Sequence, residues 1–369
     1  MLPLTLTTLA LLLSLTPAQA EKKAIRPPSG PSSGPYSAGI LAGDFLYVSG
    51  HVGPEPTGGF APGDVKTQTR RSLDLVGKVL REAGLDFSHV VSATLYLTDI
   101  RTLDAADAAW REVFPGPVYP ARIDIESPLL IPEALSEVSV IAVRAPNPAQ
   151  AIRVINPTGW TAPKRPISHA ILAANTLFFS TLRPVDPTTG TLAGTTLADQ
   201  TAQIVRNQQA LLQTAGLAPN DLAAVRIFTS DPRLPIRYPG PPSLARSTAV
   251  AGPLELGHLL HVQAVAHAPN RNAPVYVPGM AGQGATIADQ TRDALQRLDA
   301  AFRRRGCSLA DSIEAVVWLR DPRDAAAMNA VYRDIVKPNP AARATVRLSP
   351  IDLDSRITIN MTAHCTPPR

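Results

Sequence analysis

The sequence predicts an α+β protein built from three tandem copies of one unit. The first observation is a Gln-Thr pair followed by a glycine 16 residues after the Gln and an aspartate 31 residues after it. This set occurs three times: Gln68, Gly84 and Asp99; Gln200, Gly216 and Asp231; Gln290, Gly306 and Asp321. Such regular spacing indicates an internal repeat. The chain of 369 residues has room for two or three domains.

The second observation is an Ala-Arg dipeptide that opens a strand-like stretch in each copy, at Arg122, Arg246 and Arg343. Fifteen residues later a second strand-like run carries a different residue in each copy: Glu137, His261 and Thr358. The cation is kept three times and the carboxylate once. We therefore expect three structural units and a single working site.

The first copy alternates between the periodicities of strands and helices. Apolar residues Leu73, Val76 and Leu80 recur at helical spacing, and Gly84 is a typical helix stop. The run from Val90 is β-branched and alternating, which is typical of a strand. The predicted elements, in order, are a hairpin of 39–41 and 45–50, a helix over 66–83, a strand over 90–97, a helix over 102–114, the Arg122 strand and a strand over 137–144.

The later copies have each lost a different piece. In the second copy, 15 residues separate the repeat aspartate from the arginine, against 23 in the first, and a proline-rich run replaces the second helix. The third copy keeps that helix but compresses the first hairpin to 275–277. We expect domains at 21–147, 151–268 and 272–366, of which only the first is complete.

The N-terminus is typical of a secretory signal. Residues 2–17 are apolar and lead to Ala18-Gln19-Ala20, a small-x-small cleavage pattern. The run is short for a membrane span, although an uncleaved anchor is the alternative, because the segment lacks Lys and Arg. We expect residues 1–20 to be removed and the protein to be exported, periplasmic or secreted, without a membrane attachment.

Cysteines and histidines leave two questions open. Cys307 and Cys365 could form a disulfide in an exported protein or remain two buried thiols. His258 and His261 are close in sequence, but on one strand they would project from opposite faces. With no CxxC or HExxH pattern, we predict ordinary strand histidines and no metal site. The net charge is +5, but no basic patch is interleaved with aromatics, so a nucleic-acid partner is not expected.

Segments 34–50, 64–84 and 119–144 resemble the Rid family, the reactive intermediate deaminases once labelled endoribonuclease L-PSP. Residues 154–180 are similar to the start of a second Rid domain, and 287–332 with 341–363 are similar to a third. The resemblance implies a chorismate-mutase-like α+β fold, in which a mixed sheet is backed by two helices. Rid proteins are typically homotrimers with ligand clefts between subunits. We therefore expect an intrachain pseudo-trimer, a monomer equivalent to a family trimer.

The resemblance also implies hydrolysis of imines and enamines of small amino acids to a keto acid and ammonia, without a cofactor. Arg122 matches the carboxylate-binding arginine of the family, and Glu137 matches the residue that directs water. Tyr36, Ser49 and Gly50 match residues that line the ligand pocket. A guanidinium binds a carboxylate through two parallel hydrogen bonds, and a half-desolvated carboxyl can transfer protons, so the chemistry agrees.

Two departures bear on this site. Asp107 stands where the family usually has Asn, and Asp124 stands where many members have Cys, which adds negative charge near the substrate-binding residues. The later copies match only in part, at Ser180, Arg246, His261, Asn329, Arg343 and Thr358. We expect one intact site in the first unit and two degenerate ones. The alternative is a non-catalytic protein whose three clefts bind small carboxylate metabolites.

Overall fold

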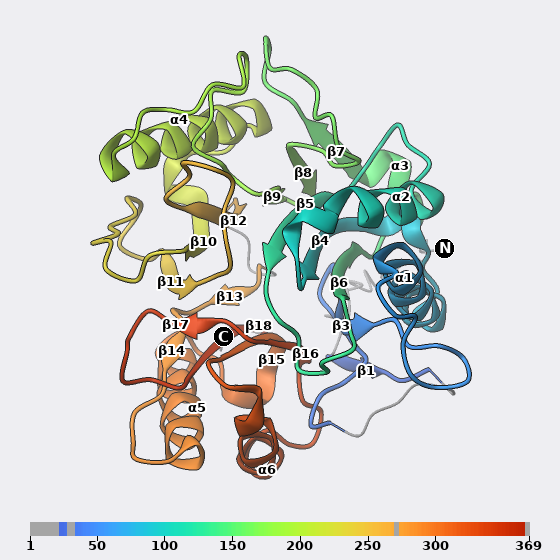
Figure 1. The fold of residues 1–369 in the computed structure, drawn as a ribbon, viewed down its shortest axis with the longest axis vertical. Helices are drawn as coiled ribbons and strands as arrows, with labels where there is room; N and C mark the ends of the chain where they lie inside the picture. Colours follow the sequence, from blue (N-terminus) through green and yellow to red (C-terminus); the bar gives the residue numbers. More distant parts are fainter. Residues whose placement is uncertain (1–21, 28–33, 269–272, 366–369) are drawn as a thin grey trace, which may run out of the picture.

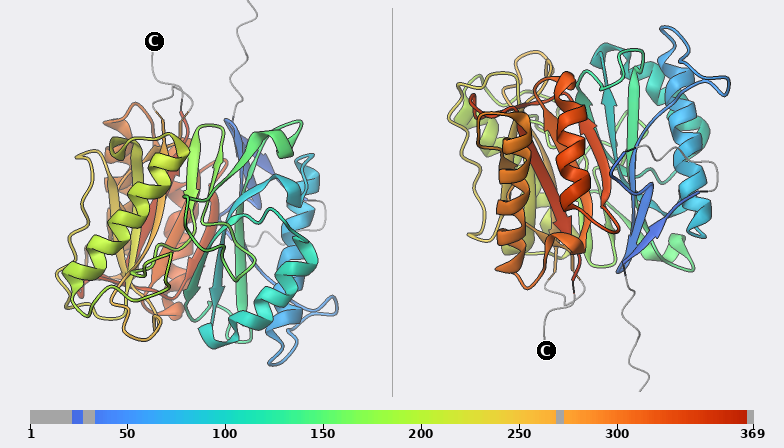
Figure 2. Two further views of the ribbon diagram at one scale, coloured as in Figure 1. Left: turned by 90° about the horizontal axis from the view of Figure 1, so that it is seen from above. Right: turned by 90° about the horizontal axis from the view of Figure 1, so that it is seen from below.

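The computed structural model describes residues 22–27, 34–268 and 273–365. The expected signal over residues 1–20 lies outside this range. Within the described residues, no helix combines the length and apolar character that crossing a membrane requires. Three mixed sheets lie toward the middle of the molecule, and the long helices cover their outer faces (Figures 1 and 2). The fold is α+β, as expected.

The first sheet has the strand order β1-β2-β3-β6-β4-β5. Only β4 and β5 run parallel, and the other neighbours are antiparallel. Apolar side chains of α1, including Leu73 and Val76, pack on Leu46 and Val138 of the sheet. The strands are β1 (Lys23–Ile25), β2 (Gly39–Ala42), β3 (Phe45–Val52), β4 (Val90–Leu97), β5 (Ala121–Glu126) and β6 (Ser136–Val143), and the helices are α1 (Val65–Glu82) and α2 (Leu103–Val113).

The second sheet has the order β17-β11-β10-β12-β9-β8-β7 and is covered by α4. A proline-rich loop joins β10 to β11 at the place where the other two units carry a second helix. A one-turn helix, α3 (Pro148–Ala151), lies in the preceding linker. The other elements are β7 (Ile152–Ile155), β8 (Ala170–Ala173), β9 (Thr176–Phe179), α4 (Leu197–Ala215), β10 (Leu222–Thr229), β11 (Ala245–Val250) and β12 (His261–His267).

The third sheet has the order β13-β18-β15-β16, and β14 also pairs with β18. Two short strands thus replace the long hairpin of the first unit. The elements are β13 (Val275–Tyr276), β14 (Met280–Ala281), α5 (Ile287–Arg303), β15 (Ser312–Leu319), α6 (Ala325–Ile335), β16 (Ala342–Val346), β17 (Ser349–Pro350) and β18 (Ile357–Ala363). Single 3₁₀ turns lie at Phe87–His89, Ile100–Thr102, Pro219–Asp221, Leu309–Asp311 and Pro322–Asp324.

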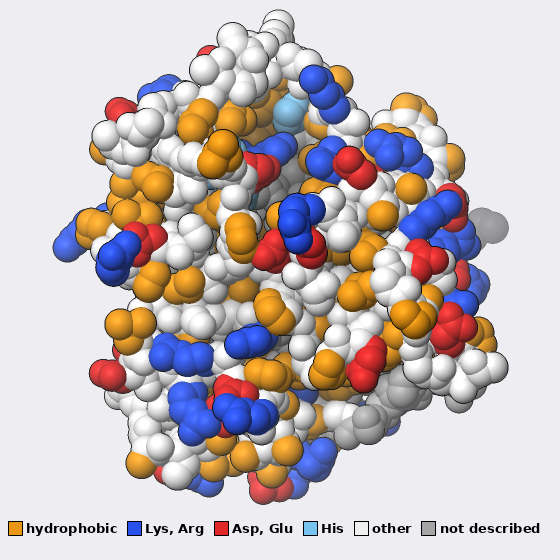
Figure 3. Space-filling model, in the orientation of Figure 1, with side chains coloured by type: hydrophobic (Ala, Val, Ile, Leu, Met, Phe, Trp, Pro, Cys, Tyr) orange, Lys and Arg blue, Asp and Glu red, His pale blue; other side chains and the backbone are white. Residues whose placement is uncertain are grey.

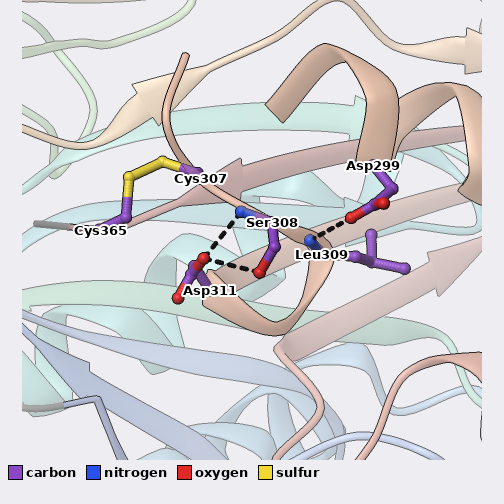
Figure 4. Close-up of a disulfide and its surroundings, with 6 residues drawn as sticks. All are labelled: Asp299, Cys307, Ser308, Leu309, Asp311 and Cys365. Atoms are coloured by element: carbon purple, nitrogen blue, oxygen red, sulfur yellow. Dashed lines mark hydrogen bonds between the residues drawn. A yellow bond between two sulfur atoms is a disulfide. The ribbon is translucent and has the colours of Figure 1, made fainter. Parts of the chain in front are cut away.

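Cys307 and Cys365 form a disulfide with a Cα–Cα distance of 5.5 Å (Figure 4). Cys307 lies in the turn after α5, and Cys365 lies two residues beyond the end of β18. The bond therefore links the C-terminal end of the third unit to its outer helix. Of the two alternatives left open by the sequence, the structure has the bridge.

The repeated landmarks have shared structural roles. Each repeat glutamine hydrogen-bonds both ways to a distant loop; for example, Gln200 Nε2 donates to the Gly257 carbonyl at 2.7 Å, and its Oε1 accepts from Leu259 N at 2.8 Å. Each glycine has a positive φ, between 74° and 81°, and ends the long helix. Each aspartate accepts a backbone N–H two residues later. Structural roles therefore explain why these three residue types recur at the same spacing in each unit.

Each unit contacts the other two. Tyr47 and Phe178 from two different sheets belong to one apolar cluster, which also contains Ile313 of the third unit. At another boundary, β11 pairs with β17, and Arg226 forms an ion pair with Glu314 at 3.0 Å. The boundaries between units thus contain buried apolar and ionic contacts, and predicted site residues lie along them.

Candidate functional site

The first of these boundary clusters surrounds Arg343, which lies on β16 of the third unit and is 6% exposed. Its guanidinium stacks on the ring of Tyr332 from α6, 4.7 Å from the ring centroid. On the other side it lies 5.4 Å from the ring centroid of Tyr36, which belongs to the first unit. Arg343 Nη2 donates to Asn329 Oδ1 at 2.7 Å. Two units therefore hold this side chain in place.

Arg343 is a buried cation without a carboxylate partner. Among the residues that the structure describes, no Asp or Glu oxygen lies within 4.0 Å of its nitrogens. A buried charge is costly unless an opposite charge or strong hydrogen bonds compensate it. The rings of Tyr36 and Tyr332 compensate it only in part, through cation–π attraction. The arrangement is suited to an anionic ligand.

Glu137 from β6 of the first unit lies beside this cation. Burial raises the pKa of Glu137 to about 8, and the nearby charge of Arg343 opposes that rise. Burial also raises the pKa of Tyr36. The charge of Arg343 opposes this rise, and the charge of Glu137 adds to it more weakly. Geometry places the side chains in one cluster, because Arg343 N bonds to Ser49 Oγ and the adjacent Gly50 lies against the carboxyl of Glu137. A carboxyl with a pKa near neutrality can act both as an acid and as a base.

Gly50 makes room for the carboxyl of Glu137. A Cβ atom at Gly50 would lie 1.8 Å from Glu137 Oε1, which no side chain could share. The two residues face each other where β3 leaves its regular register with β6, between Val48 and His51. The absence of a side chain at Gly50 therefore lets the buried carboxyl approach the β3 backbone.

Ser49 joins the two units beneath this cluster. Its Oγ accepts a hydrogen bond from Arg343 N at 2.7 Å and donates to the Ser37 carbonyl at 2.6 Å. Ser37 in turn donates to the Pro340 carbonyl at 2.7 Å. These bonds fix the backbone of the third unit against the first, so they set the distance between Arg343 and Glu137.

The structure does not bring Arg122 and Glu137 together, contrary to the expected composition of the first site. They lie on β5 and β6, and β4 runs between these strands. Arg122 faces the second unit, and its backbone N donates to Ser180 Oγ at 2.8 Å. Each arginine thus meets the next unit around the molecule: Arg343 meets the first, and Arg122 meets the second. Asn329 and Arg343 were expected to belong to a degenerate site. They lie instead near Glu137, the only glutamate among the three equivalent strand positions 137, 261 and 358.

Arg122 is already neutralised. Its Nη2 donates to Asp107 Oδ1 at 2.5 Å, and its Nε donates to Asp124 Oδ1 at 2.7 Å. Asp107 also accepts from Arg165 of the second unit at 2.7 Å. Asp107 and Asp124, which depart from the family pattern, therefore both form ion pairs with Arg122. Arg122 Nη1 has no hydrogen-bond partner among the described residues, but the two neighbouring aspartates already compensate the charge, so they would repel a substrate carboxylate.

A cleft of about 380 Å³ opens at this second boundary. Its lining includes Arg122, Ile167, Thr181 and His261, so the residue equivalent to Glu137 in the second unit faces the arginine of the first. Figure 3 shows a hollow above the centre of the molecular face, with basic, acidic and histidine side chains on its walls. The ionisable groups of this cleft therefore differ from those around Arg343.

The third boundary holds no comparable cluster among the described residues. Arg246 donates to the backbone carbonyls of Tyr238, Leu244 and Gly240. Thr358 is buried within β18, between its partners in β14 and β15. The shortened hairpin of the third unit and the missing helix of the second both fall at this boundary, which explains why Arg246 bonds to its own loop.

Sequence reasoning missed Tyr332 and Thr345. Tyr332 stacks on Arg343, and Thr345 follows it by two positions on the same strand, hence on the same face. The hydroxyls of both are buried without a hydrogen-bond partner in the described structure. Two unpartnered polar atoms beside an unpaired cation indicate room for a polar ligand. Helical spacing from Asn329 could have identified Tyr332, but only after Arg343 had been chosen.

The family model described as Endoribonuclease L-PSP matches residues 28–144, 160–234 and 261–365, and the third segment begins in β12 of the second unit and continues through the third. Together the segments cover well over half of the chain. The chain belongs to this family, the Rid family. The match in three separate segments also shows that the Rid unit is present in tandem.

Curated relatives match a single unit. A RutC family protein from Pyrococcus horikoshii is 36% identical over 112 residues, which is 30% of this chain and 88% of the relative. A 2-iminobutanoate/2-iminopropanoate deaminase from Capra hircus is 34% identical over 114 residues, 31% of this chain and 82% of the relative. Among solved structures, the Rid protein YyfA from Yersinia pestis is 34% identical and covers 33% of this chain and 99% of its own, with a TM-score of 0.32.

Proposed function

We propose that this Rid protein hydrolyses imines or enamines of small amino acids to a keto acid and ammonia, at the cluster formed by Arg343, Glu137 and Tyr36. The observation that carries the proposal is the buried Arg343, which forms no ion pair with any carboxylate in the described part of the chain and lies near a protonatable Glu137. Relatives named 2-iminobutanoate/2-iminopropanoate deaminase, about one third identical to one unit, support it.

Arg343 would bind the substrate carboxylate. Asn329 holds Nη2, and the rings of Tyr332 and Tyr36 flank the guanidinium, so little side-chain entropy is lost on binding. The bound carboxylate would also supply the missing counter-charge. Binding would therefore favour substrates with a carboxylate next to the imine carbon.

Glu137 would move the proton. At neutral pH its carboxyl is mostly protonated, because burial raises its pKa to about 8. It can donate this proton to the imine nitrogen, which makes the carbon more electrophilic. The resulting carboxylate can then take a proton from the water that attacks this carbon and return it to the nitrogen. As ammonia leaves, the carboxylate can take the proton of the new hydroxyl group, so that the C=O bond forms and Glu137 is protonated again. One water is consumed, the C–N bond breaks, and a C=O bond forms.

The test is an assay of ammonia and keto-acid release from an imine generated in situ from an amino acid by an oxidase. Arg343→Lys replaces a planar, two-pronged donor with a point charge, and we expect kcat/KM to fall about 100-fold, equivalent to about 3 kcal/mol. Glu137→Gln should lower kcat by a factor of about 100 or more. Arg246→Lys is the matched control, since the equivalent arginine of the second unit binds only backbone carbonyls, and it should retain activity.

Unchanged turnover in both Arg343→Lys and Glu137→Gln would refute the assignment. Saturable binding of a small keto acid without turnover of any imine would favour the alternative, a carboxylate-binding protein. In that case Arg343→Lys should abolish binding, while Glu137→Gln should leave it nearly intact.

We also propose that one chain is equivalent to a family trimer and is monomeric in solution. The support is that each unit contacts the other two through apolar clusters, hydrogen bonds and an ion pair. Light scattering after size-exclusion chromatography should give the mass of one chain. A stable species of three chains would contradict this proposal.

We propose, finally, that the protein is exported. The apolar N-terminal sequence and the disulfide support an oxidising compartment, since structural disulfides are rare in the cytosol. Cell fractionation with N-terminal sequencing tests this proposal. A mature chain that begins at Glu21 in an extracytoplasmic fraction is expected, and an intact Met1 in the cytosol would overturn it.

A further inference from the structure

A group of three possible metal ligands lies at the mouth of the second unit, away from Arg343. Glu255 and His258 lie in the loop between β11 and β12, and His261 is the first residue of β12. The sequence predicted that the two histidines would point to opposite faces of a strand. That prediction is wrong, because the strand begins at His261 and the preceding turn directs His258 toward it.

The three side chains converge on one point. His258 Nδ1 lies 2.9 Å from His261 Nε2, and Glu255 Oε2 lies 2.8 Å from the same His261 Nε2. The distance from Glu255 Oε2 to His258 Nδ1 is 3.6 Å. Ligand atoms around a tetrahedral zinc ion, each about 2.0 to 2.1 Å from the metal, are about 3.3 Å apart. Small side-chain rotations would therefore accommodate an ion.

Hydrogen bonding alone leaves this cluster incompletely satisfied. The Nε2 of a neutral His261 carries at most one proton, yet it faces both His258 Nδ1 and Glu255 Oε2 at hydrogen-bond distance. A single proton cannot be directed well at two acceptors. A divalent cation would accept a lone pair from all three atoms, and two imidazoles with one carboxylate form a common set of ligands for zinc-type ions.

A neighbouring cation orients one of the three possible ligands. Arg183 Nη1 binds the other carboxylate oxygen of Glu255, Oε1, at 2.9 Å and thus orients Oε2 toward the histidines.

The cluster also borders an accessible space. Glu255 and His261 both line the cleft of about 380 Å³ between the first and second units. An ion held by three protein ligands keeps a coordination position for water or for a ligand in the cleft. Both basic and acidic side chains, including Arg183 and Glu126, line the same cleft, so a polar ligand could approach the ion from there.

We propose that Glu255, His258 and His261 bind a divalent transition-metal ion of the zinc type at the edge of this cleft. The site is independent of the proposed deaminase cluster. It gives the second boundary a chemistry of its own.

The experiment is calorimetric titration of the chelator-treated, full-length protein with zinc chloride, together with the visible absorption spectrum after addition of cobalt(II). We expect one ion per chain with a Kd of about 1 μM or tighter, and d–d bands typical of a four- or five-coordinate cobalt ion. His258→Ala and Glu255→Gln should each weaken binding by a factor of about 100. Both residues lie in a loop, and the side chain of Glu255 is 48% exposed whereas that of His258 is 8% exposed, so Glu255→Gln tests the site with the smaller risk to folding.

Two controls make the result decisive. His267→Ala removes a histidine from the far end of the same strand, outside the cluster, and should bind zinc as the unmodified protein does. Glu137→Gln should also leave binding unchanged, which separates this proposal from the deaminase. The proposal is overturned if zinc uptake is not saturable near one ion per chain, or if it survives both His258→Ala and Glu255→Gln.

Discussion

The buried carboxyl of Glu137 predicts a specific dependence of stability on pH. Burial raises its pKa in the folded protein from the usual value of 4.5 to about 8, despite the opposing charge of Arg343. Between these two values the unfolded chain has lost the proton and the folded chain keeps it. The folded state is therefore relatively most stable at low pH, and this contribution is lost as pH rises through the window from about 4.5 to about 8.

The magnitude follows from the width of that window. Each pH unit within it changes the free energy of unfolding by about 1.4 kcal/mol, so the loss between pH 5 and pH 7 is about 2 to 3 kcal/mol. Glu137→Gln keeps a similar shape and cannot ionise, so this variant should not show the loss. Burial lowers the pKa of His51 to about 4, so its contribution to the free energy of unfolding increases with pH. This contribution is present in both proteins and cancels in their difference.

The assay is urea denaturation at pH 5, 6 and 7, with the difference between the two proteins taken at each pH. Glu137→Gln should gain stability relative to the unmodified protein by about 1 kcal/mol or more per pH unit. Glu82→Gln, on the exposed surface of α1, is the control and should give a flat difference. A flat difference for Glu137→Gln as well would show that this carboxyl ionises normally and would remove the proposed acid–base group.

Three further predictions concern single contacts. Gly50→Ala should lower kcat more than tenfold with little change in melting temperature, because its Cβ would displace the carboxyl of Glu137; normal kinetics would contradict the close approach. Reducing the bond between Cys307 and Cys365 should lower the free energy of unfolding by about 4 kcal/mol, since it frees a 58-residue loop, as measured by denaturation with and without reductant. Gln200→Ala should lower the free energy of unfolding by about 1 to 3 kcal/mol, because it leaves backbone groups of the facing loop without their partner, and an unchanged free energy would refute that role.

Local pattern predicted the elements of the first unit closely. The helix expected over 66–83 is α1 (Val65–Glu82), and the strand expected over 90–97 is β4 (Val90–Leu97). Apolar spacing decides which face of an element is buried. Gly84, with its positive φ, ends the helix through its own backbone conformation, whatever the surrounding tertiary structure. These signals lie within a few residues of the elements that they specify.

The composition of the site could not be predicted in the same way. Arg122 and Arg343 each follow an alanine and occupy equivalent strands, so the Ala-Arg dipeptide alone does not distinguish their roles. They differ in what surrounds them: Arg122 meets Asp107 and Asp124, whereas Arg343 meets Asn329 and an unpaired glutamate from another unit. Sequence spacing groups residues of one copy, but this cluster joins two copies.

The histidines of the second unit illustrate the same limit at a smaller scale. A shift of the strand boundary by three residues decides whether His258 and His261 diverge or meet. The ends of strands are set by the packing of neighbouring units and loops, and periodicity within the strand carries no information about them.

The sequence by itself determined the threefold repeat, the α+β class and the residues that cap and clamp each unit. These depend on backbone preferences and on burial of one face of each element, which are local properties. Only the tertiary structure decided that the arginine of one unit meets the glutamate of the next and that Glu255 joins two histidines. The physical reason is that such contacts form across boundaries between units, where the order of packing, and not the spacing along the chain, sets which side chains are neighbours.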